Sequence, residues 1–458
     1  MPMTRREFSQ AITVLGGLVA AGGLRAQGGA VILPQRQHLL LKNAYVLSMD
    51  SAIGDLPLGD VEIRDGQIAA VGRGLSAPEA EIIDASDRIV LPGFVETHWH
   101  LWTNLLRSMA GDDGYFPVSQ TMGSHYLAGD MYVAARLALA EAIHSGITFV
   151  HDWCHNIQAP EYAEEALRAL GNAGIRARFS YGTPAGQAND RSIDQAHFRE
   201  LAGNWRNYSH GGRVGLGLAW RGVGSEASLS DRAVADELGL PVSVHVNNFE
   251  RSAGGIAAIA AAGLLGPQVQ LIHAIWSSQE DIDAVAASGA SLSLSPYTEM
   301  RIGFGLPKTG EYLAAGVPIG LSVDTTTLSG NADMFAIMKM IQNVQNARAL
   351  DEFSLPARRV LELATIEGAR SMGIDAVTGS LTPGKRADVI IVNTRQLNLG
   401  VVTDPAALLV EAAQPANVES VLVDGRFLKR DGVLTAVDVD TVIDDARAAL
   451  AALLVRAA

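Results

Sequence analysis

The sequence predicts an α/β fold: a (β/α)8 TIM barrel with a small composite β-sandwich domain formed by N- and C-terminal segments. Eight short β-rich runs alternate with helix-prone stretches along the middle of the chain. Such alternation indicates parallel strands joined by helices, and eight repeats of it close into a barrel. Two further β-rich segments flank the series. Because each is too short to bury a core of its own, we expect them to pair.

The barrel strands are apolar runs that end in a loop, and most of the helices between them end at a glycine. Glycine commonly follows the last turn of a helix, where the backbone becomes left-handed. We expect strands at residues 88–95, 147–152, 177–181, 214–220, 242–246, 269–275, 291–295 and 319–323. We expect helices at residues 131–145, 160–171, 252–262, 279–287 and 310–315.

The barrel is expected to be inserted into the small domain. Residues 39–49, 59–71 and 81–83 would supply the strands of its first half, and residues 389–392 and 418–423 those of its second half. The expected segments are a twin-arginine signal peptide at 1–30, the first half of the β-sandwich at 31–91, the metal-dependent barrel at 92–375, the second half of the β-sandwich at 376–435 and a C-terminal helix at 436–458.

The composition is that of a large globular enzyme. The 458 residues are 48% hydrophobic, which is ample for a barrel of ~250 residues and a second domain. The net charge of −14 argues against a nucleic-acid partner, since binding to phosphates needs a basic face. Cys154 is the single cysteine, so no internal disulfide forms. We expect a small-molecule substrate as the partner, and the sequence leaves a homo-oligomer open.

The N-terminus carries an export pattern. Arg5 and Arg6 form a twin-arginine pair, followed by the weakly hydrophobic run 11–24 and a cleavage point after Ala26 or Ala30. The run is too short and too rich in glycine for a transmembrane helix. We therefore expect export by the twin-arginine route to the periplasm or the medium, without stable membrane association after cleavage. The alternative is a disordered N-terminus with two chance arginines.

Five metal-binding or acid–base residues follow expected strands. His98 and His100 stand two residues apart, so on an extended backbone their side chains point to the same side. His245, His273 and Asp324 each lie at the end of a later strand. A lone pair of histidines is often structural, but the carboxyl ends of parallel barrel strands meet on one face. The pattern therefore predicts a site for a divalent metal ion on that face.

Three motifs resemble those of the amidohydrolase superfamily. The stretch at 92–100 is similar to its strand-1 motif, P-G-F-V-D-x-H-x-H, with Glu96 in place of the usual aspartate. Residues 379–388 resemble its G-x-L-x-x-G-x-x-A-D signature, and residues 364–369 resemble its A-T-x-x-G-A motif. The chain is most similar to the cytosine deaminase and triazine chlorohydrolase branch, whose members hold one divalent metal. The expected strand at 214–220 has no bridging lysine, which agrees with a mononuclear site.

This resemblance implies a role for each residue of the pattern. Asp324 would bind the metal and would also carry a proton from water to the leaving group, while His273 would orient the water or polarise the substrate. The implied metal ligands are His98, His100, His245 and Asp324. We expect one divalent metal, Zn2+ first, because three imidazoles and one carboxylate suit zinc, although Fe2+ and Mn2+ are also compatible.

One departure from the branch decides the expected reaction. Its deaminases and chlorohydrolases place a glutamate three residues after the strand-5 histidine, where it protonates the ring. Here that residue is Asn248, which has no ionisable proton. Glu250 would have to curl back to replace it, and Glu299 is expected to be a solvated carboxylate in the first turn of a helix.

An amide, carbamate, urea or lactam needs less help from an acid, because the carboxylate that deprotonates the water can protonate the leaving nitrogen. The predicted activity is therefore metal-dependent hydrolysis of a non-peptide C–N bond in a planar or hydrophobic small molecule. One alternative is an aminohydrolase or dechlorinase of a heteroaromatic ring that uses Glu250 or Glu299. A second alternative is a non-catalytic relative, although such relatives usually lose their histidines.

Large aromatic and polar residues are expected to form the substrate pocket, because they follow predicted strands on the catalytic face. Tryptophan rings there would make flat apolar walls, and packing of loops against the barrel is the alternative for each ring. The expected substrate-binding residues are Trp99, Trp102, Trp153, His155, Trp220, Arg221, Asn248 and Trp276, with Met300 and Phe304 after the seventh strand.

The export prediction is testable with a conservative change. Replacing Arg5 and Arg6 with lysine removes the pair that the export receptor reads and leaves the predicted fold intact. We expect the variant to stay in the cytoplasm with unchanged specific activity, as measured by cell fractionation. Arrival of the variant in the periplasm, or a mature wild-type protein that retains Met1, would contradict the prediction.

Overall fold

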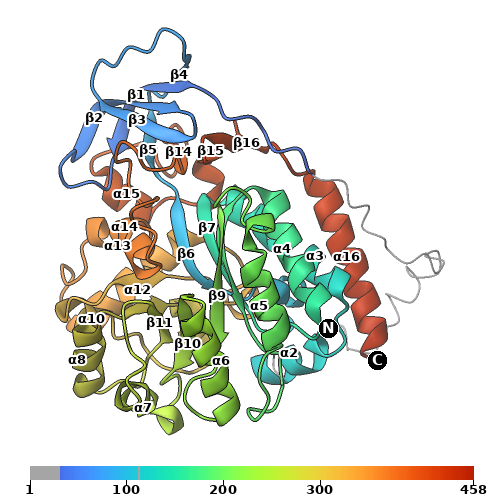
Figure 1. The fold of residues 1–458 in the computed structure, drawn as a ribbon. Helices are drawn as coiled ribbons and strands as arrows, with labels where there is room; N and C mark the ends of the chain where they lie inside the picture. Colours follow the sequence, from blue (N-terminus) through green and yellow to red (C-terminus); the bar gives the residue numbers. More distant parts are fainter. Residues whose placement is uncertain (1–30, 112–113) are drawn as a thin grey trace, which may run out of the picture.

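The computed structural model describes residues 31–111 and 114–458. Eight parallel strands close into a barrel, and a second sheet, built from both ends of the chain, lies at one end of it (Figure 1). The predicted fold class is therefore confirmed. The barrel strands are β6 (Phe94–Trp99), β7 (Ile147–Cys154), β8 (Arg176–Tyr181), β9 (Val214–Trp220), β10 (Val242–Val246), β11 (Val269–His273), β12 (Ser291–Leu294) and β13 (Ile319–Leu321).

Helices surround the barrel, and their ends follow from the local sequence. Helix α4 (Pro160–Ala173) has a proline in its first turn and ends at Gly174, whose φ is 73°. Helix α8 (Gln279–Ser288) is capped by Ser278, whose hydroxyl accepts a hydrogen bond from a backbone N–H of the first turn. The others are α3 (Ala128–His144), α5 (Gln195–Gly203), α6 (Glu226–Glu237), α7 (Gly255–Ala261), α10 (Thr309–Ala314) and α12 (Met334–Ala349).

The first predicted barrel strand, 88–95, is in fact divided between two sheets. β5 (Arg88–Pro92) pairs with β14 (Val389–Asn393) in the second sheet, whereas the next strand, β6, belongs to the barrel. The chain crosses at Gly93, where a Cβ would lie 2.1 Å from the Thr148 side chain. Only glycine fits this crossing. The continuous apolar run in the sequence concealed the break.

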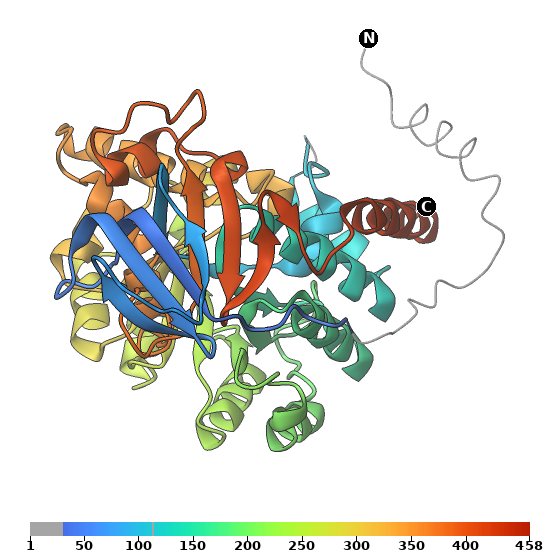
Figure 2. The same ribbon diagram turned by 90° about the horizontal axis from the view of Figure 1, so that it is seen from above.

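The second sheet joins the two ends of the chain (Figure 2). Its nine strands include the order β17-β16-β15-β14-β5-β1-β2-β3, with β4 beside β1. The two halves meet where β5 pairs with β14, and Leu41, Val90 and Val389 are buried in its core. The other strands are β1 (Leu39–Leu47), β2 (Asp55–Arg64), β3 (Gln67–Gly72), β4 (Glu81–Asp84), β15 (Val418–Val423), β16 (Arg426–Arg430) and β17 (Val433–Leu434).

The A-T-x-x-G-A motif joins two short helices: Ala364 and Thr365 lie between α13 (Ala357–Leu363) and α14 (Ile366–Ser371), and the rest of the motif lies in α14. Gly368 allows α14 to approach β6 closely, because a Cβ at this position would come within 3.2 Å of the Val95 side chain. The carbonyl of Ala364 accepts a hydrogen bond from the Val95 N–H at 2.9 Å. The motif therefore fixes the strand that leads to the first two predicted ligands.

A buried ion pair holds the barrel to the second sheet. Arg176, at the start of β8, donates to Asp388 with Nε–Oδ2 and Nη2–Oδ1 distances of 2.6 and 3.1 Å. Asp388 is the last residue of the G-x-L-x-x-G-x-x-A-D motif, and its Oδ1 also accepts the Asp424 N–H at 2.8 Å. The Arg176 and Asp388 side chains are 4% and 0% exposed. Removing one partner would leave the other charge buried alone.

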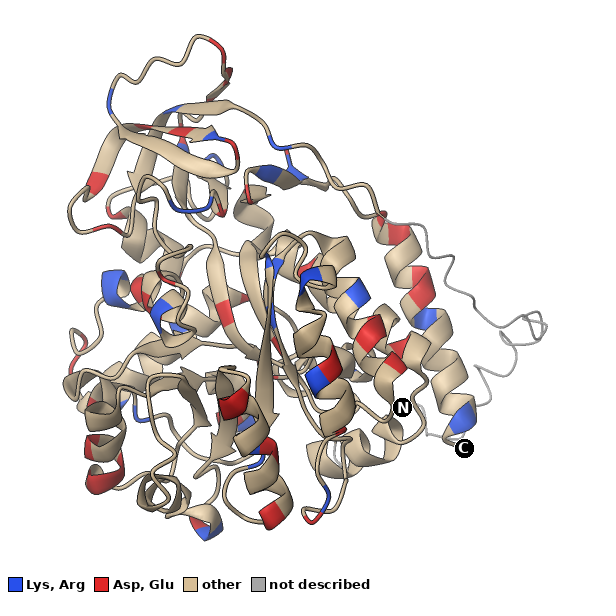
Figure 3. Cartoon of the chain, in the orientation of Figure 1, with Lys and Arg blue, Asp and Glu red and all other residues tan. Residues whose placement is uncertain are grey.

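The C-terminal helix α16 (Val439–Arg456) packs outside the barrel against α3, as Figure 1 shows. Arg136 on α3 donates to Asp445 on α16 at 2.7 Å. Acidic and basic residues are interspersed over the outer helices and loops (Figure 3). None of the described helices is long and apolar enough to cross a membrane. The predicted signal peptide, residues 1–30, lies outside the described residues.

The Asp388→Ala substitution tests the buried ion pair. We expect it to lower the free energy of unfolding by about 3–5 kcal/mol, because the Arg176 guanidinium is left buried without its partner. Arg395→Ala is the matched control, since it removes an ion pair with Asp87 whose side chains are 74% and 55% exposed. The control should cost less than about 1 kcal/mol. Equal losses for the two variants in denaturant titrations would contradict the interpretation.

Candidate metal centre

Four side chains converge at the carboxyl ends of the barrel strands. His98 lies in β6, His100 follows it, His245 lies in β10 and Asp324 follows β13. One potential ligand atom from each lies within 4.8 Å of the others. The Nε2 atoms of His98 and His245 are 3.1 Å apart. Asp324 Oδ1 is 3.1 Å from the Nε2 of His98 and 3.3 Å from that of His100. The structure thus brings together the four predicted ligands.

These spacings fit one divalent ion. A tetrahedral ion with ligands at about 2.0–2.1 Å requires ligand atoms about 3.3–3.4 Å apart, which is close to the 3.1–3.3 Å found here. Two imidazole nitrogens at 3.1 Å would repel each other if both were acceptors. A shared cation removes that conflict. Within residues 31–111 and 114–458 there is no second group of this kind.

Left-handed residues shape the strand ends around the cluster. His273 and Asp324 have φ angles of 70° and 62°, which are uncommon for residues other than glycine. The Asp324 N–H donates to the His98 carbonyl at 2.9 Å, and the His100 N–H donates to the Asp324 carbonyl at 2.7 Å. These reciprocal bonds stabilise the strained conformation that places Asp324 beside the two histidines.

Burial sets the protonation state of the cluster. Loss of water lowers the pKa of His98 to about 3 and holds the pKa of His245 well below its ordinary value. Burial opposes the charge of Asp324, but its contacts with His100 and His98 outweigh burial and hold the pKa of Asp324 well below its usual range. At neutral pH His98 and His245 are therefore neutral and Asp324 is ionised, which is the form of these ligands that binds a cation.

His273, the last residue of β11, extends the cluster. Its Nε2 is 3.9 Å from Asp324 Oδ2, and its Nδ1 is 3.1 Å from Glu299 Oε1. The expectation of a solvated Glu299 is wrong, because the first turn of α9 (Pro296–Arg301) is buried and the Glu299 side chain is 0% exposed. Burial raises the pKa of the Glu299 carboxyl, and the hydrogen bond with His273 opposes that rise.

Trp153 and His155, two of the predicted pocket residues, lie beside the ligands. The Nδ1 of His100 donates to the Trp153 carbonyl at 2.8 Å, which leaves its Nε2 beside Asp324. The Trp153 and His245 ring centroids are 4.4 Å apart, and those of His155 and His100 are 4.1 Å apart. Burial holds the pKa of His155 well below its ordinary value, so this ring is neutral near pH 7.

Glu96, the departure from the expected strand-1 motif, joins the two strands that carry ligands. Its Oε1 accepts the N–H of His98 at 2.9 Å and that of Val323 at 3.1 Å. Complete burial raises the pKa of Glu96 to about 8. The Glu96 side chain therefore holds together the backbone segments that carry His98 and Asp324.

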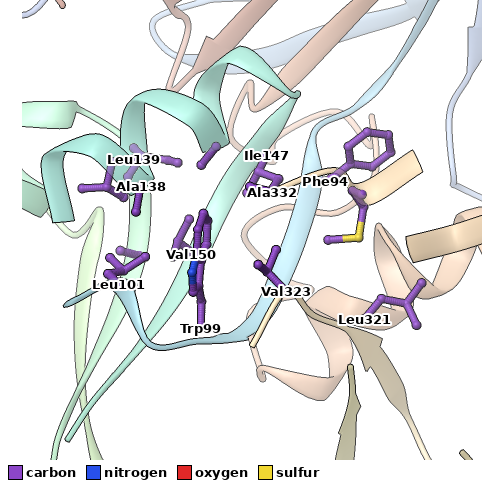
Figure 4. Close-up of a cluster of buried hydrophobic side chains, with 14 of the residues drawn as sticks. Phe94, Trp99, Leu101, Ala138, Leu139, Ile147, Val150, Leu321, Val323 and Ala332 are labelled. Carbon is purple, nitrogen blue, oxygen red and sulfur yellow. The ribbon is translucent and has the colours of Figure 1, made fainter. Parts of the chain in front are cut away.

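Two tryptophans predicted to line the pocket, Trp99 and Trp220, point away from the metal-binding cluster. Trp99 alternates with His98 and His100 along the chain, so its ring points away from them, into the apolar core beside α3 (Figure 4). Trp220 ends β9, but its indole N–H donates to the Ser228 carbonyl on α6 at 2.8 Å. Both pocket predictions are wrong, because a side chain at the end of a strand can still face the surrounding helices.

The Trp102 and Arg221 side chains form hydrogen bonds with other groups of the protein. Trp102 is 1% exposed, and its indole N–H donates to His155 Nδ1 at 3.3 Å, so it supports His155. The Arg221 guanidinium donates to the carbonyls of Ala188 and Arg191 in the preceding loop. These contacts give both side chains a structural role in place of the predicted contact with substrate.

Aromatic rings lie next to the cluster, and we refer to Phe116, Phe249, Phe304 and Trp276 as the aromatic mouth. The Phe249 ring centroid is 4.6 Å from that of Phe304 and 6.2 Å from that of Phe116. Phe304 lies 5.1 Å from His273. Trp276 is 40% exposed and donates its indole N–H to the Phe304 carbonyl at 2.8 Å. These contacts form a chain of aromatic side chains from the exposed Phe116 and Trp276 to His273.

Tyr115, Phe116 and Phe249 are absent from the sequence prediction. Tyr115 and Phe116 begin α2 (Tyr115–Gly123), and nothing in the sequence marks this helix as belonging to a site. The Tyr115 hydroxyl is buried without a hydrogen-bond partner, and burial and the charge of Asp324 raise its pKa. Phe249 follows β10, so its position after a strand was an available signal.

Asn248 and Glu250 supply no acid to the cluster. Asn248 is half-buried, and its Oδ1 has no hydrogen-bond partner. Glu250 begins a short 3-10 helix and is exposed, so it does not curl back over the site. Of the residues considered for the missing acid, Glu299 is the one that contacts a histidine of the site.

Comparison with known proteins gives matches along most of the chain. The sequence model of the Amidohydrolase family matches residues 89–428. The 5'-deoxyadenosine deaminase of Methanothermobacter thermautotrophicus is 31% identical over 420 residues, which are 87% of this chain and 96% of that protein. The 5-methylthioadenosine/S-adenosylhomocysteine deaminase of Syntrophomonas wolfei is 27% identical over 434 residues, which are 90% of this chain and 98% of that protein.

Solved structures share the fold. An adenosine deaminase from Xanthomonas campestris with bound zinc superposes with a TM-score of 0.80 at 22% identity, covering 91% of this chain and 98% of that one. The atrazine chlorohydrolase from Arthrobacter aurescens, complexed with zinc, gives a TM-score of 0.77 at 21% identity, covering 90% of this chain and 100% of that one. Both similarities extend over the barrel and the second sheet.

The metal content of the purified protein tests the centre. We expect about one divalent ion per chain in the wild type, and its loss in His98→Ala and Asp324→Ala, because each removes one of four converging ligands. The control His210→Ala changes an exposed histidine and should retain the ion. Two ions per chain, or full metal content in both ligand variants by elemental analysis, would contradict the assignment.

Proposed function

Because the chain belongs to the amidohydrolase family, we propose that it is a metal-dependent aminohydrolase of a heteroaromatic ring. Water would replace a ring amino group, and ammonia would be released. The relatives named as deaminases support this choice of bond. The sequence alone favoured an amide-type substrate, and the comparisons instead favour its heteroaromatic alternative.

The buried contact between Glu299 and His273 is the observation that carries the proposal. Asn248 stands where a ring deaminase of this branch would need a carboxylic acid. Glu299 is 0% exposed and lies 3.1 Å from His273, so a second carboxylate is present beside the cluster. This weakens the chemical objection to a ring substrate, because a buried carboxylate holds His273, which together with Asp324 would carry the protons in place of the missing acid.

The residues of the cluster have distinct roles in this proposal. His98, His100, His245 and Asp324 would hold the divalent ion, and zinc fits this set of donors. Such an ion is a Lewis acid, and when bound it would lower the pKa of water so that hydroxide is available at neutral pH.

Asp324 is poised to accept the proton of the attacking water. Its Oδ1 faces the histidines, and its Oδ2 is the oxygen nearer to His273. His273 would contact the ring substituent or ring nitrogen through Nε2. The proton taken from water then passes to the departing nitrogen, which leaves as ammonia while the ring carbon gains the oxygen.

The aromatic mouth suits a flat substrate. Phe249 and Phe304 meet edge to face, with an interplanar angle of 81°, and Phe304 lies beside His273. Aromatic rings in this arrangement leave one face or edge available for stacking against a planar ligand. A heteroaromatic ring that enters past Phe304 would therefore meet His273 next.

A second candidate is hydrolysis of an amide, carbamate, urea or lactam. The observation that favours it is Asn248, because an amide side chain cannot protonate a ring nitrogen. Such substrates need only one proton carrier, and Asp324 suffices for that task.

A substrate panel separates the two candidates. We expect ammonia release from at least one aminated heterocycle among cytosine, guanine, adenosine-type nucleosides and an aminotriazine, with little turnover of aryl amides or carbamates. Asp324→Asn should lower kcat by about 10²- to 10⁴-fold, because it removes the proton carrier. Turnover of amides alone, without ammonia release from any heterocycle, would favour the second candidate and contradict the first.

A further inference from the structure

Glu299 is held at one oxygen and free at the other. Oε1 accepts the Ser295 N–H at 2.8 Å and lies 3.1 Å from His273 Nδ1. Oε2 is buried and has no hydrogen-bond partner. Burying a carboxylate oxygen without a partner costs free energy. A position that served packing alone would be better filled by a neutral side chain, so the carboxylate points to a role in the site.

The two contacts of Oε1 fix the direction of the hydrogen bond with His273. Because Oε1 already accepts a backbone N–H from Ser295, a proton on the Glu299 carboxyl would lie on the free Oε2. Oε1 is therefore an acceptor whether the carboxyl is charged or neutral. It follows that the Nδ1 of His273 carries a proton and donates it to Glu299.

This hydrogen bond also determines what the other nitrogen does. With Nδ1 turned to Glu299, the Nε2 of His273 lies 3.9 Å from Asp324 Oδ2. The ring centroids of His273 and Phe304 are 5.1 Å apart, so His273 also borders the aromatic mouth. The backbone of the same region is fixed as well, since the Phe304 N–H donates to the Glu299 carbonyl at 2.9 Å. Glu299 thus anchors both the ring of His273 and the segment that carries Phe304.

We propose that Glu299 is a positioning residue that acts through His273. It fixes the ring in the Nδ1–H form and keeps Nε2 directed to Asp324 and the incoming substrate. Asn248 gives this role its importance, because without an acid at that position the proton transfers depend on Asp324 and His273. The inference rests on the proposed function for its kinetic assay, and a spectroscopic measurement tests it independently.

The kinetic test compares two substitutions at Glu299. Glu299→Leu removes the acceptor, and we expect kcat to fall about 10- to 100-fold with KM and metal content nearly unchanged. Glu299→Gln keeps an acceptor oxygen for both N–H groups and should stay within a few-fold of wild type. Glu250→Leu is the matched control, since it removes an exposed carboxylate near the site and should leave kcat unchanged.

A double-mutant cycle with His273→Asn shows whether Glu299 acts through the histidine. In the His273→Asn background, Glu299→Leu should have no further effect on kcat, because the residue through which it acts is gone. Additive losses would overturn the proposal, as would a fully active Glu299→Leu or a Glu299→Gln variant as impaired as Glu299→Leu. These assays use whichever substrate the wild type turns over, so failure of the ring-deaminase proposal is seen separately in the wild-type panel.

The spectroscopic test needs neither a substrate nor a folded variant at position 299. The zinc-loaded wild-type protein is labelled with 15N-histidine, and the signals of His273 are assigned by their loss in His273→Asn. We expect a protonated Nδ1 whose proton resonates downfield because of its hydrogen bond with Glu299. A His273 ring protonated only at Nε2 would overturn the proposal even if every kinetic result agreed with it.

Discussion

The site depends on the closure of the barrel between β6 and β13. These two strands share a single paired position, Leu321 with Glu96. The junction between them, which we call the seam, therefore depends on hydrogen bonds other than those between paired strand residues. Glu96 accepts N–H groups from both sides of the seam, and the backbones of His98, His100 and Asp324 bond reciprocally across it. Three of the four ligand side chains are therefore placed by one seam.

Burial gives this seam its chemistry. Removing water keeps His98 and His245 neutral, while the contacts with His100 and His98 keep Asp324 ionised. The result is a compact set of metal-binding atoms with one carboxylate, whose charge a divalent cation would compensate. Glu299 adds a second buried carboxylate outside the set of ligands, where it reaches the site through His273.

The sequence predicted the fold and the convergence of the ligands because both follow from chain order. Alternating strands and helices imply a parallel barrel, and residues at strand ends then meet on one face. The direction of single side chains was harder to predict. The alternation of residues along a strand could have shown that Trp99 points away from His98, but Trp220 required knowledge of how α6 packs. The burial of Glu299 depends on how α9 docks, which no local pattern encodes.

The proposed site holds one metal ion at the seam, with His273 and Glu299 beside it. A crystal structure of the metal-loaded protein, with anomalous diffraction recorded at the absorption edge of the metal, tests this most directly. We expect one anomalous peak within about 2.0–2.2 Å of ligand atoms of His98, His100, His245 and Asp324, with Glu299 still hydrogen-bonded to His273. Two peaks, a peak elsewhere, or a Glu299 side chain turned away from His273 would contradict it.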